Sequence, residues 1–467
     1  MSKSAMGVPT VGEELSDAEL GDARLTRRLA SMATRAMGSP DAGFPQMVAS
    51  DTELEGVYRF LSNERVSAAA ILEPHVKATI ERSALQGTVL VLHDTTSFEF
   101  GGNSRREGLG LMIGNGQGFF AHVALAVALG ESRLALGVLD LEHWQRPTRK
   151  HSNHNPLTRL DANRESLRWG RMLAHVEKRR AGRFDCVHVM DREADIVEVL
   201  LEARRSGARY VIRSAHDRAI EGRDAHVRAR VAQLEFSVRR EVSLAARNDK
   251  GRPGVVRKRH PSRAARTTTL GIAGCSVELR PGPYHLDEPP IAVHLVHVRE
   301  IDTPNGEAPV DWLLYTTEPI ATEEQLAAVV DMYRARWVIE EYFKALKTGC
   351  AIEKRQLESY RALTNALAMF VPVAWRLLML RSFARIAPDA PARAVVSDVQ
   401  LRLLVHKLKL TEPLATAEQA IGAVARLGGH LRRNGAPGWQ TLGRGFDALL
   451  LMQVGWRAAI QAGRCDQ

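Results

Sequence analysis

The chain has 467 residues, of which 45% are hydrophobic and 25% charged, an ordinary composition for a globular protein that is expected to fold as two or three domains. Lysine and arginine outnumber aspartate and glutamate by 64 to 54, and the resulting net charge of +10 favours a polyanionic partner. The N-terminus lacks a basic-then-apolar signal pattern, and no uncharged run approaches the ~18 residues of a membrane span, so no membrane contact is expected. The four cysteines are scattered without metal-ligand spacing, which is typical of a reduced, cytoplasmic protein.

Residues 11–70 are expected to be helical, with a break at Gly38–Pro40 and a second helix at Asp51–Leu61. Arg24, Arg27 and Arg28 lie three to four residues apart, so one side of the first helix is basic. Such a face is either an ordinary solvated surface or a contact for a polyanion.

Two apolar runs are each followed by an aspartate. Thr88–Leu92 leads to Asp94, and Cys186–Met190 leads to Asp191. Valine-rich runs of this length read as buried strands of an α/β sheet, where functional groups gather at the carboxyl ends of strands. We therefore expect both aspartates at strand ends. Taken singly, each is equally well explained as a turn residue or a helix cap.

The segment from Thr88 to Ser214 alternates strands with helices. Its other predicted elements are strands at 119–129, 134–141 and 209–213 and helices at 165–180 and 196–205. A ribonuclease-H-like (retroviral-integrase-like) core has this order, with a mixed sheet covered by helices. The predicted fold class is therefore α/β.

Helical periodicity disappears over residues 216–310, which predicts a β-rich insertion. Its Arg257–Arg263 segment is the densest basic cluster and is either a solvated loop or a phosphate contact. Beyond the insertion, Asp311–Tyr315 reads as a strand. Thr322–Gln325 reads as a capping box that opens a long helix.

One face of that long helix carries polar side chains that recur at about 3.6 residues per turn. These residues are Tyr333, Arg336, Glu340, Lys344 and Lys347. A carboxylate flanked by cations suits a site that holds a divalent metal together with phosphates of a nucleic acid. The alternative is a solvated face laced with ion pairs, which is common. The residues expected to anchor the helix from its sides are Trp337, Ile339, Phe343 and Leu346.

After residue 358 the sequence is helical again, with an apolar stretch from Leu363 to Leu380. Near its end, apolar side chains recur at three- and four-residue steps, which predicts a helix that either caps a core or pairs with a second copy. The stripe consists of Trp439, Leu442, Phe446, Leu449 and Leu450.

Together, these motifs resemble the DDE transposases of bacterial insertion sequences. Asp94, Asp191 and Glu340 match the Asp-Asp-Glu triad of that family. With Glu340, the residues Tyr333, Arg336 and Lys347 match the tyrosine–arginine–glutamate–lysine (YREK) signature of one group within it. The segments that extend the resemblance are Leu20–Asp22, Tyr58–Phe60, His93–Ser97, Asp191–Ile196, Trp312–Leu314 and Ala425–Gly429.

The resemblance implies a cut-and-paste transposase that binds element ends, cleaves phosphodiester bonds and joins 3′ hydroxyl ends to target DNA, through a hairpin intermediate. It implies that the three acids hold two Mg²⁺ or Mn²⁺ ions, the hard cations that oxygen-only ligands select. The implied DNA contacts are Tyr333, Arg336, Lys344, Lys347, Trp312, Arg213, Arg24, Arg27, Arg28 and Arg59. Trp312 would stack on a flipped base, although a buried core tryptophan is the simpler alternative.

Three domains are then expected: a helical end-binding domain at 1–70, a catalytic domain at 71–380 that contains the insertion, and a helical dimerisation domain at 381–467. The expected assembly is a homodimer on double-stranded DNA, both terminal repeats and target, in the bacterial cytoplasm at the nucleoid. The alternative is an end-binding repressor or inhibitor of transposition that has lost catalysis. Cleavage of end-containing DNA with Mg²⁺ separates the two.

Overall fold

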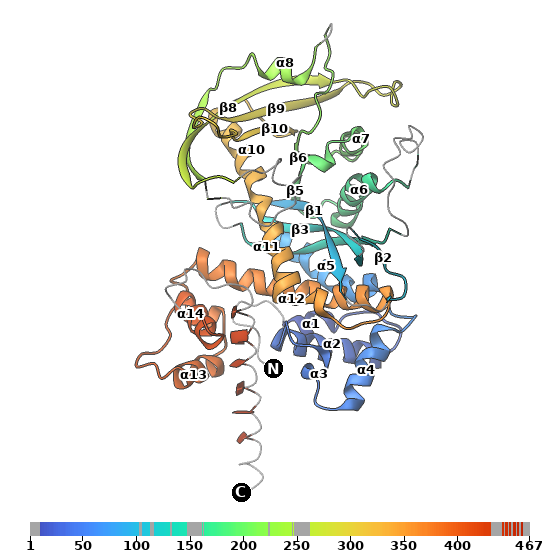
Figure 1. Cartoon of the computed structure of the whole chain (residues 1–467), viewed down its shortest axis with the longest axis vertical. Coiled ribbons are helices and arrows are strands. Elements are labelled where there is room, and N and C mark those ends of the chain that lie inside the picture. The colour runs from blue at the N-terminus through green and yellow to red at the C-terminus, as the bar shows by residue number, and fades with distance from the viewer. Residues whose placement is uncertain are drawn as a thin grey trace. The chain divides into compact units, whose positions relative to one another are not determined.

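The computed structural model describes residues 10–101, 105–112, 116–130, 133–146, 161, 163–222, 225–244, 246, 262–430 and part of 441–460. The chain, drawn in Figure 1, divides into two compact units. Unit 1 comprises Met1–Pro156, Gly182–Asp185 and Trp337–Gln467, and unit 2 comprises Leu157–Ala181 and Cys186–Arg336. Both units contain helices and strands, so the protein is mixed α/β as predicted. The division groups the chain differently from the three predicted domains, because unit 1 contains both terminal helical regions and the first predicted strands.

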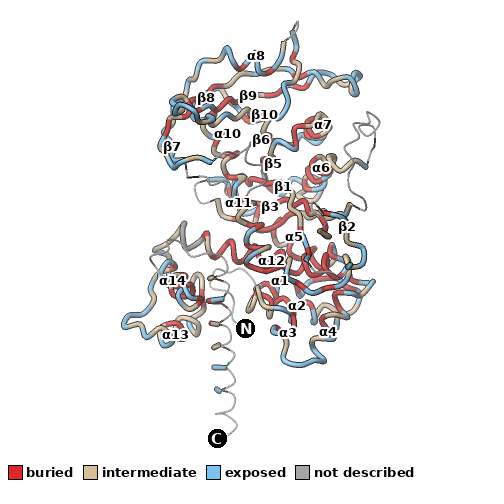
Figure 2. The backbone as a smooth tube through the Cα atoms, in the orientation of Figure 1, coloured by how far each residue is buried: buried red, intermediate tan, exposed pale blue. Residues whose placement is uncertain are grey.

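The sheet of unit 1 is centred on β3 (Gln117–Ala128), which pairs antiparallel with three other strands. They are β1 (Thr88–Phe100), β2 (Gly110–Leu111) and β4 (Ala135–Trp144). The β1–β3 register runs from Val89 opposite Ala128 to Phe100 opposite Gln117. Residues 121–128 of β3 are all buried, because both faces of this strand are covered (Figure 2).

The N-terminal helices of unit 1 begin at side chains that satisfy free backbone N–H groups. Asp22 caps α2 (Ala23–Gly38) and Ser50 caps α4 (Asp51–Leu61). The predicted helix at 51–61 is thus confirmed at both ends. The other helices of this group are α1 (Val11–Leu15), α3 (Phe44–Met47) and α5 (Ala68–Ala84).

The apolar stretch predicted at 363–380 lies within α12 (Tyr360–Ile386), the core helix of unit 1. It is long and apolar enough to cross a membrane, but 94% of its most apolar window is buried inside the protein. It packs against α5 and β4, and the indole Nε1 of Trp375 donates a hydrogen bond of 2.9 Å to the carbonyl of Ala135. The apolar composition of α12 is therefore explained by core packing.

The C-terminal helical region contains α13 (Asp398–Lys407), α14 (Ala417–Leu427) and helical residues within 441–460. Leu442, Phe446 and Leu449 are buried in one cluster with α14. The predicted use of this stripe as a dimer contact is therefore wrong for these three residues, because their apolar face is already covered by the chain's own helices. Trp439 and Leu450 lie outside the described residues.

The strands of unit 2 follow the order β5, β6, β10, β9, β8, β7. β5 and β6 are parallel, and the later pairs are antiparallel. Their bounds are β5 (Asp185–Met190), β6 (Arg209–Arg213), β7 (Val238–Leu244), β8 (Arg266–Leu279), β9 (Ile291–Glu300) and β10 (Asp311–Thr316). The helices α6 (Arg168–Arg180) and α7 (Val197–Ser206) pack against each other, as Figure 1 shows. The structure thus confirms the predicted helices at 165–180 and 196–205 and the strand at 209–213.

The region predicted as a β-rich insertion contains β7, β8 and β9 and also a short helix, α8 (Val227–Val231). Of the basic segment Arg257–Arg263, only Ser262 and Arg263 belong to the described residues.

The single helix predicted across 333–347 is interrupted at Arg336. The capping box at Thr322 opens α10 (Glu323–Ala335), as predicted, and α11 (Trp337–Lys344) follows directly. At Arg336 the backbone N–H bonds to the carbonyl of Tyr333 at 3.1 Å, with φ −50° and ψ −31°. This is the tighter turn of a 3₁₀ helix, in which the hydrogen bond spans three residues.

Candidate active site

Tyr333, near the end of α10, is the centre of a group of predicted site residues in unit 2. Its ring meets that of Trp312 on β10 edge to face, with centroids 5.4 Å apart and an interplanar angle of 66°. Tyr333 is buried and Trp312 is half-buried. The predicted base-stacking residue is therefore partly engaged in the protein's own packing, without being fully enclosed.

Three charged side chains act on the Tyr333 hydroxyl. Burial raises the pKa of Tyr333, Arg213 and Arg336 oppose this rise through their charges, and Arg213 adds a side-chain hydrogen bond. The charge of Asp191 acts in the opposite direction and raises the pKa further. The structure thus brings together five of the predicted residues, Asp191, Arg213, Trp312, Tyr333 and Arg336, within unit 2.

Asp191 and Arg213 lie near each other because of the parallel pairing of β5 with β6. Met190 is the partner of Ile212 in that register, so the residues that follow them emerge at the same edge of the sheet. Asp191 comes directly after β5, as predicted, and its Oδ1 accepts a hydrogen bond of 2.8 Å from the backbone of Glu193. Asp191 therefore also caps a short 3₁₀ helix, Arg192–Ala194. This is the helix-cap role that the sequence analysis gave as the alternative to a catalytic one.

In unit 1, Asp94 lies within β1 and not at its carboxyl end, so that prediction is wrong. The strand continues to Phe100, since the β-branched and aromatic residues after Asp94 keep pairing with β3. Asp94 is opposite Val123 in this pairing, and its Oδ1 accepts a hydrogen bond of 2.8 Å from the backbone of Thr95. Its side chain is half-buried, which leaves it partly accessible to solvent.

Glu340 lies in the first turn of α11, a helix that packs against β1 in the same unit. The structure thus brings the elements that carry Asp94 and Glu340 into contact. The neighbouring Glu341 is held differently: its carboxylate pairs with Lys344 and with Arg381 of α12, each at 2.9 Å. This pairing gives Glu341 a structural role in joining α11 to α12.

Two expectations about this helix need correction. Trp337 is 59% exposed and does not anchor it, whereas Ile339, Phe343 and Leu346 are buried as predicted. Trp337 precedes Glu340 by three residues, so helical spacing alone places it on the side of the helix that carries Glu340.

The predicted polar face is also not continuous to its end. The segment Ala345–Gly349 is a π-helix, whose wider turn rotates Lys347 away from strict α-helical spacing. The Nζ atom of Lys347 lies 3.5 Å from a carboxylate oxygen of Glu353 and 5.5 Å from the ring centroid of Phe98 on β1. Lys344 is exposed.

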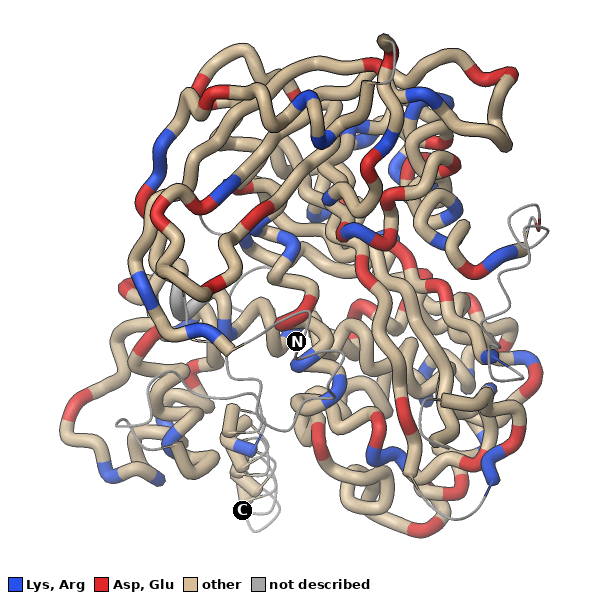
Figure 3. The backbone as a smooth tube through the Cα atoms, turned by 45° about the horizontal axis from the view of Figure 1, so that its top comes forward, with Lys and Arg blue, Asp and Glu red and all other residues tan. Residues whose placement is uncertain are grey.

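The N-terminal arginines Arg24, Arg27, Arg28 and Arg59 are all exposed. Arg24 pairs with Asp22 at 2.9 Å, and Arg59 pairs with Glu55 at 2.5 Å. Arg28 donates a hydrogen bond of 3.1 Å to the carbonyl of Gly56, which links α2 to α4. Basic and acidic residues are interspersed along the described chain (Figure 3).

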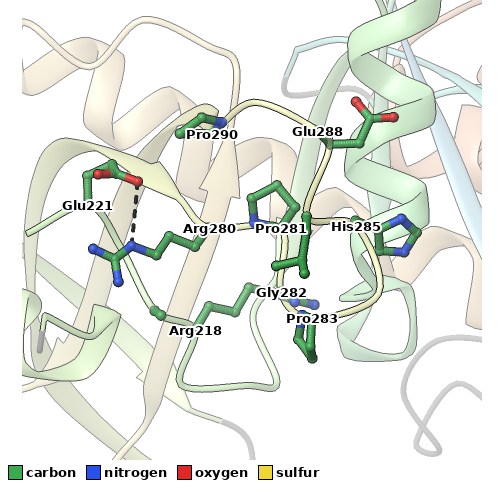
Figure 4. A pocket seen from close by; sticks show the side chains of 11 residues that line it. Arg218, Glu221, Arg280, Pro281, Gly282, Pro283, His285, Glu288 and Pro290 are labelled. Atoms are coloured by element: carbon green, nitrogen blue, oxygen red, sulfur yellow. Dashed lines mark ion pairs between the residues drawn. The ribbon is translucent and has the colours of Figure 1, made fainter.

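Unit 2 contains a pocket of about 640 Å³ (Figure 4). Its charged side chains have carboxylate partners: Arg280 lies 3.5 Å from Glu221, and Arg218 donates to Asp195 at 2.7 Å. No residue predicted for the active site lines this pocket, and we assign it no role in the chemistry.

Comparison with family models identifies two domains. Residues 10–66 match a transposase DNA-binding domain, and residues 150–371 match a transposase DDE domain. The chain is a DDE transposase. It is thus a DNA-binding enzyme of transposition that transfers phosphoryl groups with divalent metal ions, and its DDE domain implies a ribonuclease-H-like core.

The two matches cover the candidate residues unevenly. The DNA-binding match contains all four N-terminal arginines. The DDE match contains Asp191 and Glu340 but begins after Asp94. The assignment of all three acids stays a prediction, and that of Asp94 is based on its motif and on the packing of β1 against α11.

Proposed function

We propose that this transposase belongs to the YREK group and moves its element by a cut-and-paste route. It would bind the terminal repeats, cut the strands at each end through a hairpin intermediate, and join the 3′ hydroxyl ends to target DNA. The observation that carries this proposal is the grouping of Asp191 with Tyr333, Arg213 and Arg336 in unit 2. An acid beside a tyrosine and two guanidinium groups suits a phosphate held next to a metal ligand.

The proposed metal ligands are Asp94, Asp191 and Glu340. All three are half-buried carboxylates, and an oxygen-only donor set of this kind fits Mg²⁺ or Mn²⁺. Bound there, two such ions would supply a metal-activated water as nucleophile and stabilisation of the leaving 3′ oxygen.

Cationic residues would bind the DNA backbone beside the cut. Arg336 and Arg213 present planar guanidinium groups for bidentate contacts with phosphate, and the Tyr333 hydroxyl would orient one oxygen. Lys344 and Lys347 would contact further phosphates as point charges. The half-buried Trp312 would stack on a base that leaves the helix at the hairpin.

The N-terminal arginines would read the element ends within a homodimer that cuts both ends together. Holding two ends before either is cut requires two copies of the chain, and their location would be the bacterial cytoplasm at the nucleoid. Arg27 is the clearest candidate for a DNA contact, because Arg24, Arg28 and Arg59 also make contacts within the protein.

The decisive experiment is cleavage of a DNA fragment that carries both boundaries of the element, with Mg²⁺ and with EDTA. We expect nicks at the boundary and hairpin ends with Mg²⁺ alone. Binding of the ends without any cleavage would instead identify an end-binding repressor. Cleavage that leaves open ends would keep the transposase assignment and refute the hairpin.

A further inference from the structure

Unit 2 contains a second group of potential metal ligands, unrelated to the residues assigned to DNA chemistry. Glu177 in the last turns of α6 meets Cys186 and His188 on β5. Cys186 and His188 are two residues apart on a strand, so their side chains project from the same face. The two elements that carry these side chains, α6 and β5, are joined by a short turn.

The ligand atoms have the spacing of a tetrahedral metal site. The distances are 3.0 Å from His188 Nε2 to Glu177 Oε1, 3.4 Å from Cys186 Sγ to Glu177 Oε1, and 3.8 Å from Cys186 Sγ to His188 Nε2. At ordinary zinc bond lengths, tetrahedral angles place nitrogen and oxygen about 3.3 Å apart, sulfur and oxygen about 3.5 Å, and sulfur and nitrogen about 3.6 Å. The triangle therefore needs shifts of only a few tenths of an ångström.

The charge states of the cluster also suit a metal. Burial would raise the pKa of Glu177, but hydrogen bonds with His188 and Arg180 outweigh it and lower that pKa to about 2. Burial lowers the pKa of His188, which favours the neutral imidazole that metals bind. A bound divalent ion would displace the thiol proton of Cys186, and the thiolate and carboxylate would then balance its charge.

Arg180 competes with a metal ion for the Glu177 carboxylate, but its hydrogen bonds also orient that carboxylate. Its Nη2 donates to Glu177 Oε2 at 2.5 Å and its Nε to Oε1 at 2.8 Å. The carboxylate is thereby held with Oε1 towards both the imidazole and the thiol. Arg180 can keep Oε2 while Oε1 becomes a ligand, since each carboxylate oxygen has two lone pairs.

A nucleophilic Cys–His–Glu relay does not fit the same atoms. In such a relay the thiol and the carboxylate contact different ring nitrogens, whereas here both lie near Nε2. Cys186 is also buried, out of reach of a substrate.

We propose that Glu177 Oε1, Cys186 Sγ and His188 Nε2 bind one Zn²⁺ ion, with water as the fourth ligand. A thiolate and an imidazole select zinc over the magnesium that the three acids of the active site would take. The ion would fix the end of α6 to β5, three residues before Asp191. It would be structural in effect, since none of its ligands belongs to the proposed catalytic group.

The test is titration of the purified full-length protein with Co²⁺ in excess Mg²⁺, which occupies hard oxygen sites. We expect one equivalent of cobalt with a thiolate-to-cobalt charge-transfer band in the near ultraviolet, and displacement of that band by Zn²⁺. Cys186→Ser and His188→Gln should both lose the band. Cys275→Ser, which alters a cysteine outside the cluster, should keep it.

A second measurement keeps the proposal falsifiable where a variant fails to fold. Zn²⁺ should raise the melting temperature of the wild-type protein and slow alkylation of Cys186, mapped by mass spectrometry, relative to Cys350. The proposal is overturned if cobalt gives no charge-transfer band in the wild-type protein. It is equally overturned if Cys275→Ser abolishes the band while Cys186→Ser retains it.

Discussion

The ring of Tyr333 rests edge to face on the indole of Trp312, with 5.4 Å between their centroids. Tyr333, proposed to orient a phosphate, and Trp312, proposed to stack on a base, thus pack directly against each other. A change in one alters the support of the other, so their roles must be separated by matched substitutions.

Trp312→Ala should leave the first nick intact and slow hairpin formation, since loss of a stacked base costs about 1–3 kcal/mol. The melting temperature should fall modestly, because the indole also packs against Tyr333. Tyr333→Phe is the matched control: it keeps the ring contact, removes the hydroxyl, and should weaken both steps equally. If Trp312→Ala slows both steps to the same extent, the indole serves only packing.

Asp94→Asn, Asp191→Asn and Glu340→Gln should each abolish cleavage and leave binding of the ends within a few-fold of wild type, because the metal ions serve the chemistry more than docking. Glu341→Gln is the control on the same helix. Its carboxylate is bound to Lys344 and Arg381, so the substitution should lower the melting temperature and spare cleavage. Cleavage that survives in Glu340→Gln but is lost in Glu341→Gln would refute the assignment.

Arg27→Ala should reduce the dependence of end binding on salt, since each phosphate contact contributes a slope of about −0.9 in log K against log[salt]. Arg28→Ala should show the same loss together with lower stability, because its guanidinium also bonds to the Gly56 carbonyl. Fluorescence anisotropy over a salt series measures the slopes. An unchanged slope in Arg27→Ala would place this arginine outside the DNA interface.

Unfolding of the protein should become easier below the ordinary pKa of histidine, 6.5, because of His75. His75 is buried and neutral: its Nδ1 bonds to Glu14, and its Nε2 accepts from the Val138 backbone at 3.0 Å. Burial lowers its pKa, so below pH 6.5 the unfolded chain takes up a proton that the folded state excludes. The contribution of His75 to the free energy of unfolding is therefore complete above pH 6.5. It decreases as the pH is lowered below 6.5, by at most about 1.4 kcal/mol per pH unit for one proton.

Urea unfolding of wild type and His75→Gln across this pH range measures the effect. The difference between the two curves isolates His75, because the buried His143 and His188 contribute to both. Parallel curves would show that folding does not lower the pKa of His75.

The C-terminal helical residues include both exposed and buried apolar side chains, so substitutions there can separate dimerisation from folding. Trp456 and Ile460 are 45% and 43% exposed, whereas Phe446 is buried. Replacing the two exposed residues with serine should weaken pairing of DNA ends without lowering the melting temperature. Phe446→Ala should instead destabilise the fold by about 3–5 kcal/mol. Sedimentation of the protein with end DNA measures pairing, and full pairing in the double variant would locate the dimer contact elsewhere.

Sequence pattern predicted the local elements of this protein well, because their signals are local. The strand at 209–213 agrees residue for residue, and the capping box at Thr322 begins α10 as expected. In each case the signal, an apolar run or a capping side chain, lies in neighbouring residues of the sequence and can be recognised without knowing the distant partners.

Two of the wrong predictions concern features that depend on distant partners. β1 extends past Asp94 because β3 continues to pair with it, and the stripe at Leu442, Phe446 and Leu449 is buried because α14 covers it. An apolar stripe on a predicted helix indicates that another surface packs against it, but the sequence does not indicate which surface that is. The π-helix at Ala345–Gly349 likewise has no sequence signal that we can identify.

Buried side chains that follow α11 in the sequence hold the N-terminal region of the chain in place. Arg355 donates hydrogen bonds of 2.5 Å to the carbonyls of Pro40 and Cys350, and Asn365 donates to those of Leu61 at 2.9 Å and Val66 at 3.2 Å. The contacts to the N-terminal helices span 299 to 315 residues of sequence. At about 5–20 residues per second, a ribosome needs roughly 15–60 s to cover that separation. A nascent chain therefore cannot complete these contacts until most of it has been made, so an interrupted translation product lacks the support that holds its DNA-binding helices.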